Sequence, residues 1–204
     1  MKLVRLTEFG GPDVLTVADA PVPVPAPGQI LIEVEAAAVN FADVVRRRND
    51  PYPFPTPLPF TPGGEVAGTV AALGDDVDGP AVGTRVFALV GRDGSGGYAE
   101  YAVADAPQVV PVPPGVSTEE AAGIVVAGAT AMLTLTEVGR LGPGQTVLIE
   151  GAGGGVGQYA VQIAKLLGAT VVGAAGTDDR RRAALAAGAD HVVDYTRPGW
   201  AQQV

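Results

Sequence analysis

A run of glycines between a strand-like and a helix-like segment constrains this chain most. Residues 146–150 read Thr-Val-Leu-Ile-Glu, which favours a strand, and residues 151–157 read Gly-Ala-Gly-Gly-Gly-Val-Gly. Without Cβ atoms the backbone can turn sharply and approach a pyrophosphate, while the N–H groups and positive dipole end of a following helix face the anion. The run therefore predicts a nucleotide-binding turn.

The spacing of this run is A-x-G-x-x-G, with Ala152, Gly154 and Gly157, and not a strict G-x-G-x-x-G. A glycine run alone is a weak signal. Its flanks strengthen it, because a helix is expected over 156–167 and a second strand over 170–175, and this order opens a doubly wound parallel sheet. A glycine-rich surface turn between unrelated elements is the alternative.

The elements after the second strand continue the same alternation. We expect a helix over 178–187 and a third strand over 191–194, after which only ten residues remain. A dinucleotide-binding fold has six strands in its common form. The sequence therefore predicts a partial doubly wound sheet, truncated at its C-terminal side.

The first half of the chain has short strand patterns separated by glycine and proline. Two proline-alternating stretches, 21–27 and 51–59, should be extended connections. We expect an antiparallel β-domain over residues 1–116, followed by the partial α/β domain over 117–204. The strands are expected at 3–8, 14–18, 30–37, 65–73, 85–89 and 97–104.

One uncharged apolar segment, residues 121–136, could be mistaken for a membrane span. It is shorter than the roughly 20 residues that cross a bilayer. Residues 117–120, Ser-Thr-Glu-Glu, form a capping-box pattern in front of it. We therefore expect a buried helix of a soluble protein.

Composition excludes several classes of function. The 204-residue chain is 47% hydrophobic with a formal charge of −9, which predicts a globular protein without general attraction to nucleic acid or membranes. Two basic runs, 46–48 and 180–182, are most simply solvated faces. The chain has no cysteine and a single histidine, His191, so disulfides and thiolate zinc sites are excluded. Residues 1–6 alternate like a strand and not like a secretory signal, which favours a cytoplasmic location.

The end of the second strand bears on the choice of nucleotide. An acidic residue about 20 residues beyond the glycines binds the ribose of NAD in this fold, but residues 172–177 contain no carboxylate. Thr177 with Arg180 or Arg181 would instead suit a 2′-phosphate, which favours NADPH over NADH. The aspartates at 178–179 are counter-evidence, although carboxylates also stabilise a helix N-terminus.

Several separated motifs in order carry a family resemblance. The chain resembles the medium-chain dehydrogenase/reductase superfamily, and within it the zinc-free quinone oxidoreductase branch of zeta-crystallin-like proteins. The resemblance implies an N-terminal GroES-like β-domain and a Rossmann domain. Its motifs are Phe-Gly-Gly-Pro-Asp-Val-Leu at 9–15, Val-Asn-Phe-Ala-Asp at 39–43, Pro-Gly-Gly-Glu-Val-Ala-Gly at 62–68, Gly-Ala-Thr-Ala at 128–131, the segment 153–165, and Gly-Ala-Asp-His at 188–191.

The zinc-dependent branch of this superfamily carries a histidine where this chain has Gly64, and cysteines elsewhere. No zinc is therefore implied. Without a Lewis acid, alcohol oxidation is a poor candidate, whereas hydride delivery to an electron-poor acceptor needs less help. The family likewise implies quinones and other conjugated carbonyls as substrates.

The resemblance also implies roles for individual residues. It implies that Asn40 and Thr130 lie near nicotinamide and substrate, and that Tyr52 matches a cleft tyrosine that enoyl-thioester reductases use as a proton donor. The alternatives are that Asn40 caps a helix and that Thr130 bonds back within its own helix. The segment after Asp43 is about two residues longer than in the family pattern. Tyr52 is therefore displaced along the chain relative to the tyrosine that it matches.

The resemblance assigns cofactor-binding residues as well. Gly154, Gly155, Val156 and Gly157 would bind the pyrophosphate. Arg180 stands where relatives often have a lysine for the 2′-phosphate, and Tyr195 matches a tyrosine against the adenosine, or is simply a strand-end aromatic. Gly176 departs from the serine common in NADPH-using relatives.

These observations together predict an NADPH-dependent oxidoreductase that transfers hydride to a quinone or α,β-unsaturated carbonyl bound between the two domains. An enoyl-thioester reductase is the second enzymatic hypothesis. A truncated, non-catalytic nucleotide-binding protein is the hypothesis from another class. The expected partner is a small molecule, and homo-oligomers are possible because an unfinished sheet has a free edge.

Overall fold

The computed structural model describes all 204 residues, which form two compact units, Met1–Val126 and Ala127–Val204. The division falls later than the boundary after Val116 that the sequence predicts. The helix α2 (Thr118–Ala122) explains the difference, since it packs on the β-sheet of the first unit. The alanines 121 and 122 are buried there with Ala67 of that sheet.

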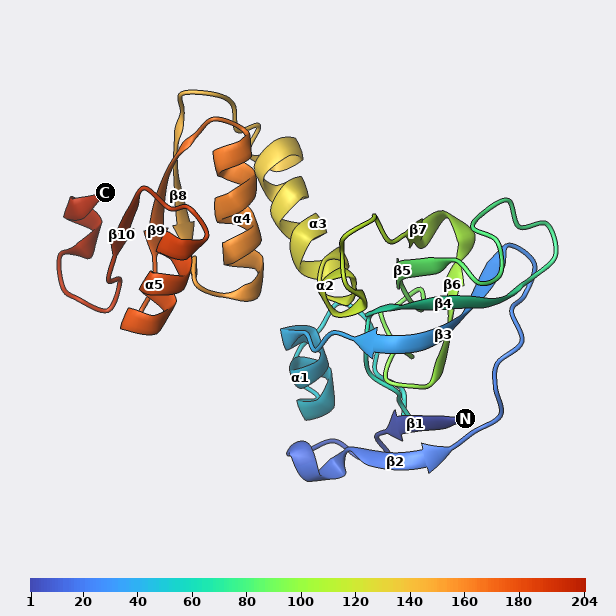
Figure 1. Cartoon of the computed structure of the whole chain (residues 1–204). Helices are drawn as coiled ribbons and strands as arrows, with labels where there is room; N and C mark the ends of the chain where they lie inside the picture. Colours follow the sequence, from blue (N-terminus) through green and yellow to red (C-terminus); the bar gives the residue numbers. More distant parts are fainter. The chain divides into compact units, whose positions relative to one another are not determined.

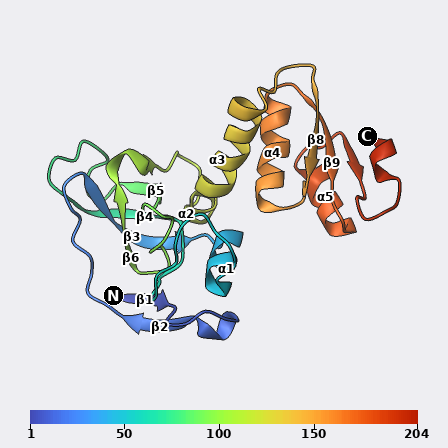
Figure 2. The ribbon, with the colours of Figure 1, turned by 180° about the vertical axis from the view of Figure 1, so that it is seen from behind.

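The first unit is built on a five-stranded antiparallel sheet in the order β6-β3-β4-β5-β7 (Figure 1). Viewed from behind, β3 lies between β4 and β6 (Figure 2). A separate antiparallel hairpin pairs β1 with β2. The strands are β1 (Lys2–Arg5), β2 (Thr16–Asp19), β3 (Gln29–Ala37), β4 (Glu65–Leu73), β5 (Arg85–Leu89), β6 (Tyr101–Asp105) and β7 (Val109–Pro111), with 3-10 turns at Pro12–Val14 and Ala106–Gln108.

The core of this sheet follows from the period-2 alternation of its strands. Small and β-branched side chains from β3 to β7 point to one side and are buried together. The predicted bounds of β4 and β5 are confirmed, whereas β6 begins later than expected and β7 was not expected. The buried side chains are Ile30, Ile32, Val66, Val70, Val86, Ala88, Val90, Ala102, Ala104 and Val109.

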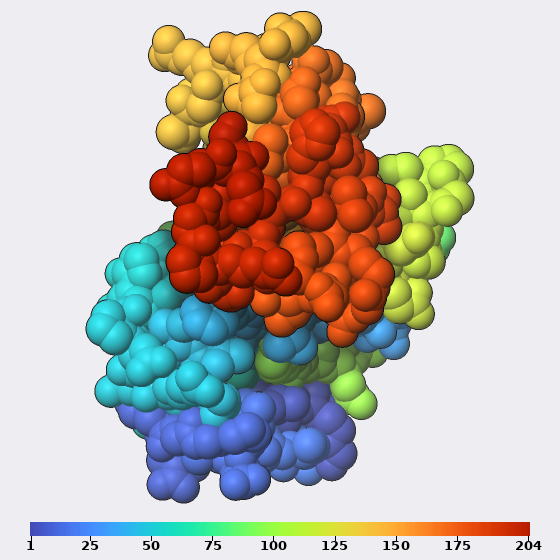
Figure 3. Space-filling model, turned by 90° about the vertical axis from the view of Figure 1, so that its left-hand side faces the viewer, coloured from blue at the N-terminus to red at the C-terminus, as the bar shows by residue number.

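The helix α1 (Phe41–Arg48) was implied only by the alternative in which Asn40 caps a helix. The carboxylate of Asp43 accepts a hydrogen bond from the backbone N–H of Asn40 at 2.8 Å, which closes the first turn. The helix ends at Asn49, whose φ of 60° is left-handed. The proline-rich segment 51–59 follows and lies largely on the surface, where it is drawn in cyan (Figure 3).

The expectation of a solvated face at residues 46–48 is wrong for two of the three arginines. The exposed fractions are 1% for Arg46 and 7% for Arg47, and only Arg48 is exposed. Arg47 donates to the backbone oxygen of Gly10, and Arg46 has several partners that are described below. A guanidinium group can be buried when protein acceptors replace the hydrogen bonds that it would make to water.

The expectation of one buried helix over 121–136 is also wrong. The segment breaks after α2 at Gly123, continues as α3 (Val125–Leu133) and ends in a π-helical turn at Thr134–Val138. Ala131 is buried, but Met132 is 45% exposed. The capping box in front of α2 is confirmed, because the Ser117 hydroxyl accepts from the N–H of Glu120 and the Glu120 carboxylate accepts in return.

The second unit contains a three-stranded parallel sheet in the order β10-β9-β8. The order of the strands and their parallel pairing are those expected for the first part of a Rossmann fold. Its elements are β8 (Thr146–Glu150), α4 (Gly155–Leu166), β9 (Thr170–Ala174), α5 (Asp178–Ala186), β10 (His191–Val193) and a 3-10 turn at Trp200–Gln203.

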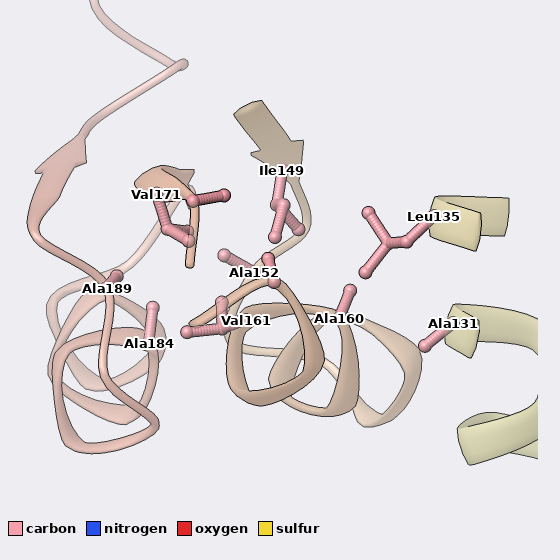
Figure 4. Packing of buried hydrophobic residues seen from close by; sticks show 11 residues of the cluster. Ala131, Leu135, Ile149, Ala152, Ala160, Val161, Val171, Ala184 and Ala189 are labelled. Carbon is pink, nitrogen blue, oxygen red and sulfur yellow. The ribbon is translucent and has the colours of Figure 1, made fainter. Parts of the chain in front are cut away.

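The two faces of this sheet pack against different elements. Val171 of β9 packs with residues of α4 and α5, as Figure 4 shows for Val161 and Ala184. The next residue, Val172, points to the other face, where Trp200 packs. Alanine at these helix positions lets α4 and α5 approach the sheet closely.

No helix in the molecule has the length and apolar character that crossing a membrane requires.

Candidate functional site

The predicted nucleotide turn leaves β8 at the carboxyl end of the parallel sheet. Gly151 takes a left-handed φ of 68°, and the next N–H, that of Ala152, donates to the oxygen of Ala174 at 3.1 Å. Gly154 precedes the first turn of α4, so the free N–H groups of that turn follow the glycines directly. The carboxyl edge of such a sheet is where ligands bind in doubly wound folds.

The glycines are required by close approach of the backbone. A Cβ on Gly157 would lie 2.2 Å from the oxygen of Gly151, and one on Gly153 would lie 2.3 Å from the oxygen of Arg180. A Cβ on Gly155 would meet nothing within 4 Å, so the loop is open on that side. The residues present thus form a cradle of N–H groups that fits a pyrophosphate.

A cavity of about 550 Å³ lies beside this loop. It combines apolar side chains of β8 with the backbone of the glycine turn, as dinucleotide sites generally do. Gly154, Gly155, Val156 and Gly157 all line it, together with residues 147–151, Ala160, Thr134, Leu135 and Gly139.

The three arginines of α5 have different environments. Arg181 is held by Asp194, at 3.0 Å from its Oδ2, and also pairs with Asp178. Arg182 pairs with Asp179. Arg180 is exposed, has no carboxylate within ion-pair distance, and its Nη1 lies 3.5 Å from where a Cβ of Gly154 would be. Of the two candidates for a 2′-phosphate, Arg180 is therefore the available one, while Arg181 is a structural residue.

Thr177 is the N-cap of α5, since its hydroxyl accepts from the N–H of Arg180 at 3.3 Å. Tyr195 follows β10 and is 42% exposed. A Cβ on Gly176 would lie 3.0 Å from the Tyr195 ring, so this ring occupies the space that a side chain at position 176 would need. The structure thus brings Thr177, Arg180, Tyr195 and the glycine turn to one edge of the sheet.

The first unit has a second candidate cavity, of about 260 Å³. Asn40 and Tyr52, two of the predicted catalytic residues, both line it, together with Phe54 from the proline-rich segment. Arg92 and Gly94 form the side contributed by the loop after β5. The segment after Asp43 is longer than the family resemblance implies, and Tyr52 still reaches this cavity.

Asn40 is held at two points by buried carboxylates. Its backbone N–H donates to Asp43, and its side-chain Nδ2 donates to Oε1 of Glu65 at 2.9 Å. The other oxygen of Glu65 accepts from the N–H of Val126 at 2.7 Å. Asn40 is therefore the N-cap residue of α1, as the alternative interpretation held, and it forms a capping box with Asp43, while its side-chain Nδ2 also binds a residue of β4.

Buried Asp43 and half-buried Tyr98 form a further pair beside this cavity. The Tyr98 hydroxyl donates to Asp43 at 2.9 Å, and the N–H of Gly63 donates to the other carboxylate oxygen at 3.0 Å. Burial, followed by the charge and hydrogen bond of Asp43 and the charge of Glu65, raises the pKa of Tyr98 well above its usual value. The phenol therefore stays protonated at neutral pH. Sequence reasoning missed Tyr98, since only the fold brings residues 43 and 98 together.

Arg46 lies behind the cavity wall. Its guanidinium donates to Thr56 Oγ1 at 3.1 Å, to the backbone oxygen of Pro55 at 3.0 Å, and to both the backbone and the carboxylate of Asp93 at 2.8 Å. It also lies 5.4 Å from the ring centre of Tyr52. Burial would raise the pKa of Asp93, but hydrogen bonds from Arg46 and Ser95 outweigh it and hold that pKa below its usual value. This arginine thus connects α1 to two loops.

Thr130, the third predicted catalytic residue, lies on α3 in the second unit and is exposed. It lines neither of the two cavities. Its placement beside the nicotinamide stays a prediction. No group of three or more histidine, aspartate and glutamate side chains comes together in an arrangement that could hold a metal ion.

Known proteins resemble both units of the chain. Residues 26–114 match the family model of the alcohol dehydrogenase GroES-like domain, and residues 155–204 match that of the zinc-binding dehydrogenases. The chloroplastic quinone oxidoreductase QR1 of Triphysaria versicolor is 40% identical over 97% of this chain and 63% of its own length. Both parts of the chain thus match dehydrogenase domains, and nearly the whole chain is similar to quinone oxidoreductases of the medium-chain dehydrogenase/reductase superfamily.

Solved structures agree with this assignment. The quinone oxidoreductase of Escherichia coli, complexed with NADPH, is 30% identical with a TM-score of 0.91, and the match covers all of this chain and 61% of that one. A structure described as an NAD-dependent alcohol dehydrogenase is 37% identical with a TM-score of 0.93, over all of this chain and 66% of that one. The chain thus spans less than two thirds of the length of these relatives.

Proposed function

We propose that this chain belongs to an NADPH-dependent oxidoreductase that reduces a quinone or an α,β-unsaturated carbonyl without zinc. The observation that carries the cofactor preference is Arg180, an arginine without a carboxylate partner that lies against the glycine turn. The quinone oxidoreductases among the relatives support the reaction class, and the NADPH-bound relative supports the nucleotide.

Each cofactor-binding residue has a defined task in this proposal. The N–H groups of Gly154, Gly155, Val156 and Gly157 bind the pyrophosphate at the positive end of α4. The Thr177 hydroxyl and the Arg180 guanidinium bind the 2′-phosphate, and a guanidinium can do so through two N–H groups. Tyr195 packs against the adenosine. When bound, the nicotinamide supplies the hydride.

The small cavity of the first unit is the proposed site for the acceptor. Asn40, fixed by Glu65, offers its amide to the carbonyl group of the substrate. Thr130, in the second unit, is proposed to offer its hydroxyl to the nicotinamide. The apolar ring of Phe54 suits a flat conjugated acceptor. An acceptor that is already electron-poor requires little further polarisation, which is consistent with Gly64 at the position of the zinc-binding histidine and with the absence of cysteine.

The test is oxidation of NADPH by the protein in the presence of small quinones and enones, followed at 340 nm. We expect turnover with at least one quinone and a lower KM for NADPH than for NADH. Absence of turnover with every acceptor, while NADPH still binds, would favour the hypothesis of a non-catalytic nucleotide-binding protein.

Enoyl-thioester reduction is the second enzymatic proposal, because Tyr52 lines the same cavity as Asn40 and could donate a proton from its hydroxyl. Substitution Tyr52→Phe should then abolish activity on an acyl thioester while leaving quinone reduction largely intact. Unchanged thioester reduction would refute the proton-donor role of Tyr52.

A cytoplasmic location and assembly into homo-oligomers stay predictions.

A further inference from the structure

Glu65 is a buried carboxylate that the proposed reaction does not use directly. Its exposed fraction is 1%, and no lysine or arginine lies within ion-pair distance of it. Burial of a carboxylate without a cationic partner costs free energy that an apolar side chain at this position of β4 would avoid. Its two oxygens instead accept from Asn40 Nδ2 and from the N–H of Val126.

These two donors belong to the wall of the candidate substrate cavity. Asn40 and Val126 line the cavity, and so does Gly64, the residue before Glu65. Glu65 itself does not line it. The carboxylate therefore acts behind the wall and fixes two of the groups that form it.

We propose that Glu65 is a positioning residue that holds the Asn40 amide in one of its two orientations. The proposal rests on the function proposed above for Asn40. A carboxylate only accepts hydrogen bonds, so it attracts the NH₂ group of Asn40 and repels its carbonyl oxygen. Rotation of the amide by half a turn would place Oδ1 against Oε1 of Glu65, at the present separation of 2.9 Å. Glu65 thus fixes which end of the amide is which: Nδ2 gives one N–H to Glu65 and keeps its second N–H for a carbonyl group, and Oδ1 lies at the opposite end.

The backbone of Asn40 is fixed as well, which makes the amide orientation its main remaining freedom. The hydrogen bond to Asp43 holds the N–H of Asn40, and Asp43 is itself held by Tyr98 and Gly63. A rigid backbone with a rigid side chain is what a group that orients substrate requires, since small errors in placement reduce rates strongly.

The substitution Glu65→Gln tests this idea with a change of a single group. The introduced amide has one accepting oxygen, whereas two N–H donors face the position, so one donor loses its partner. Glu65→Asp keeps two accepting oxygens on a shorter stem and is the second variant. Glu33→Gln on β3 is the matched control, because Glu33 is exposed and accepts only from the Tyr101 hydroxyl.

The direct readout is the NMR signal of the Asn40 side chain. The chain contains only two asparagines, Asn40 and Asn49, so selective ¹⁵N-asparagine labelling gives two side-chain NH₂ pairs. We expect slow hydrogen exchange and a shifted resonance for Asn40 in the wild type, compared with exposed Asn49. Glu65→Gln should speed this exchange roughly tenfold or more, and Glu33→Gln should not.

Kinetics supply the second readout. If Glu65 acts through Asn40, then Glu65→Gln should lower kcat for quinone reduction by roughly ten- to a hundredfold with little change in the KM for NADPH. The double variant with Asn40→Ala should be no slower than Asn40→Ala alone. Additive losses would show a merely structural role and overturn the proposal.

The two readouts separate this inference from the proposed function. A wild type without turnover but with a protected Asn40 amide would refute the function and support the positioning role. Exchange at Asn40 as fast as at Asn49 in the wild type would overturn the positioning role, and this holds even where Glu65→Gln fails to fold.

Discussion

Arg46→Met should destabilise the first unit far more than Arg48→Met, although both arginines belong to one basic run on α1. Arg46 is 1% exposed, and Arg48 lies in solvent. Methionine keeps most of the side-chain length and apolar volume in each case, so the comparison isolates the guanidinium group.

The magnitude follows from the partners that the guanidinium leaves behind. Two backbone oxygens, of Pro55 and Asp93, and the Thr56 hydroxyl lose a donor; full burial of such an acceptor without a partner costs roughly 1–3 kcal/mol, and these three acceptors are only partly buried. The Asp93 carboxylate is 37% exposed, so water replaces much of that interaction. We expect a loss of about 3 kcal/mol for Arg46→Met. For Arg48→Met we expect about 0.5 kcal/mol, from the lost charge at the helix C-terminus.

Hydrogen exchange of the β3 and β4 amides, followed by mass spectrometry along a urea series, measures the unfolding free energy of the first unit. The single tryptophan, Trp200, lies in the second unit, so its fluorescence provides an internal control that neither substitution should change. Losses for Arg46→Met and Arg48→Met that agree within about 0.5 kcal/mol would refute the argument, because the burial of Arg46 would then have no energetic consequence.

Three further predictions concern the second unit. Arg180→Ser should weaken NADPH binding at least about tenfold but leave NADH binding unchanged by calorimetry; equal losses would contradict the assignment of the 2′-phosphate. Gly157→Ala should lower stability by about 1–3 kcal/mol and abolish NADPH binding, because its Cβ would come 2.2 Å from a backbone oxygen, whereas Gly155→Ala should fold normally in thermal melts. Hydrogen bonds from Lys165 and from a backbone N–H hold the pKa of Asp190 below its usual value. Asp190 therefore stabilises the fold above the unfolded pKa of about 4 and loses this effect as pH falls through the lower folded pKa, so Asp190→Asn should flatten the acid limb of stability against pH.

Local patterns predicted much of the fold because the forces involved act over a few residues. The glycine turn, the strand at 65–73 and the βαβ order of the second unit are confirmed. Alternation with period 2, glycine between strand and helix, and a capping box are properties of neighbouring residues, and the structure keeps all of them.

The predictions that were wrong concern features that depend on contacts between residues far apart in the sequence. The run at 46–48 has the same composition whether it is solvated or buried, and only loops at 55–56 and 93 make burial of Arg46 possible. The apolar segment 121–136 was expected to be one buried helix, but it breaks at Gly123 and exposes part of its length. Of the two arginines proposed for the 2′-phosphate, Arg181 is held by Asp194, a contact that residue identity alone does not indicate.

The sequence by itself determined that a glycine turn follows a strand and precedes a helix, that no cysteine is present to bind zinc, and that residues 172–177 at the end of the second strand contain no carboxylate. These are matters of residue identity and spacing. Tertiary structure alone decided which arginine remains available beside the glycines, and that Glu65 and Asp43 hold Asn40 from two sides. Such roles depend on desolvation and hydrogen-bond geometry between segments far apart in the chain, and no local pattern encodes those quantities.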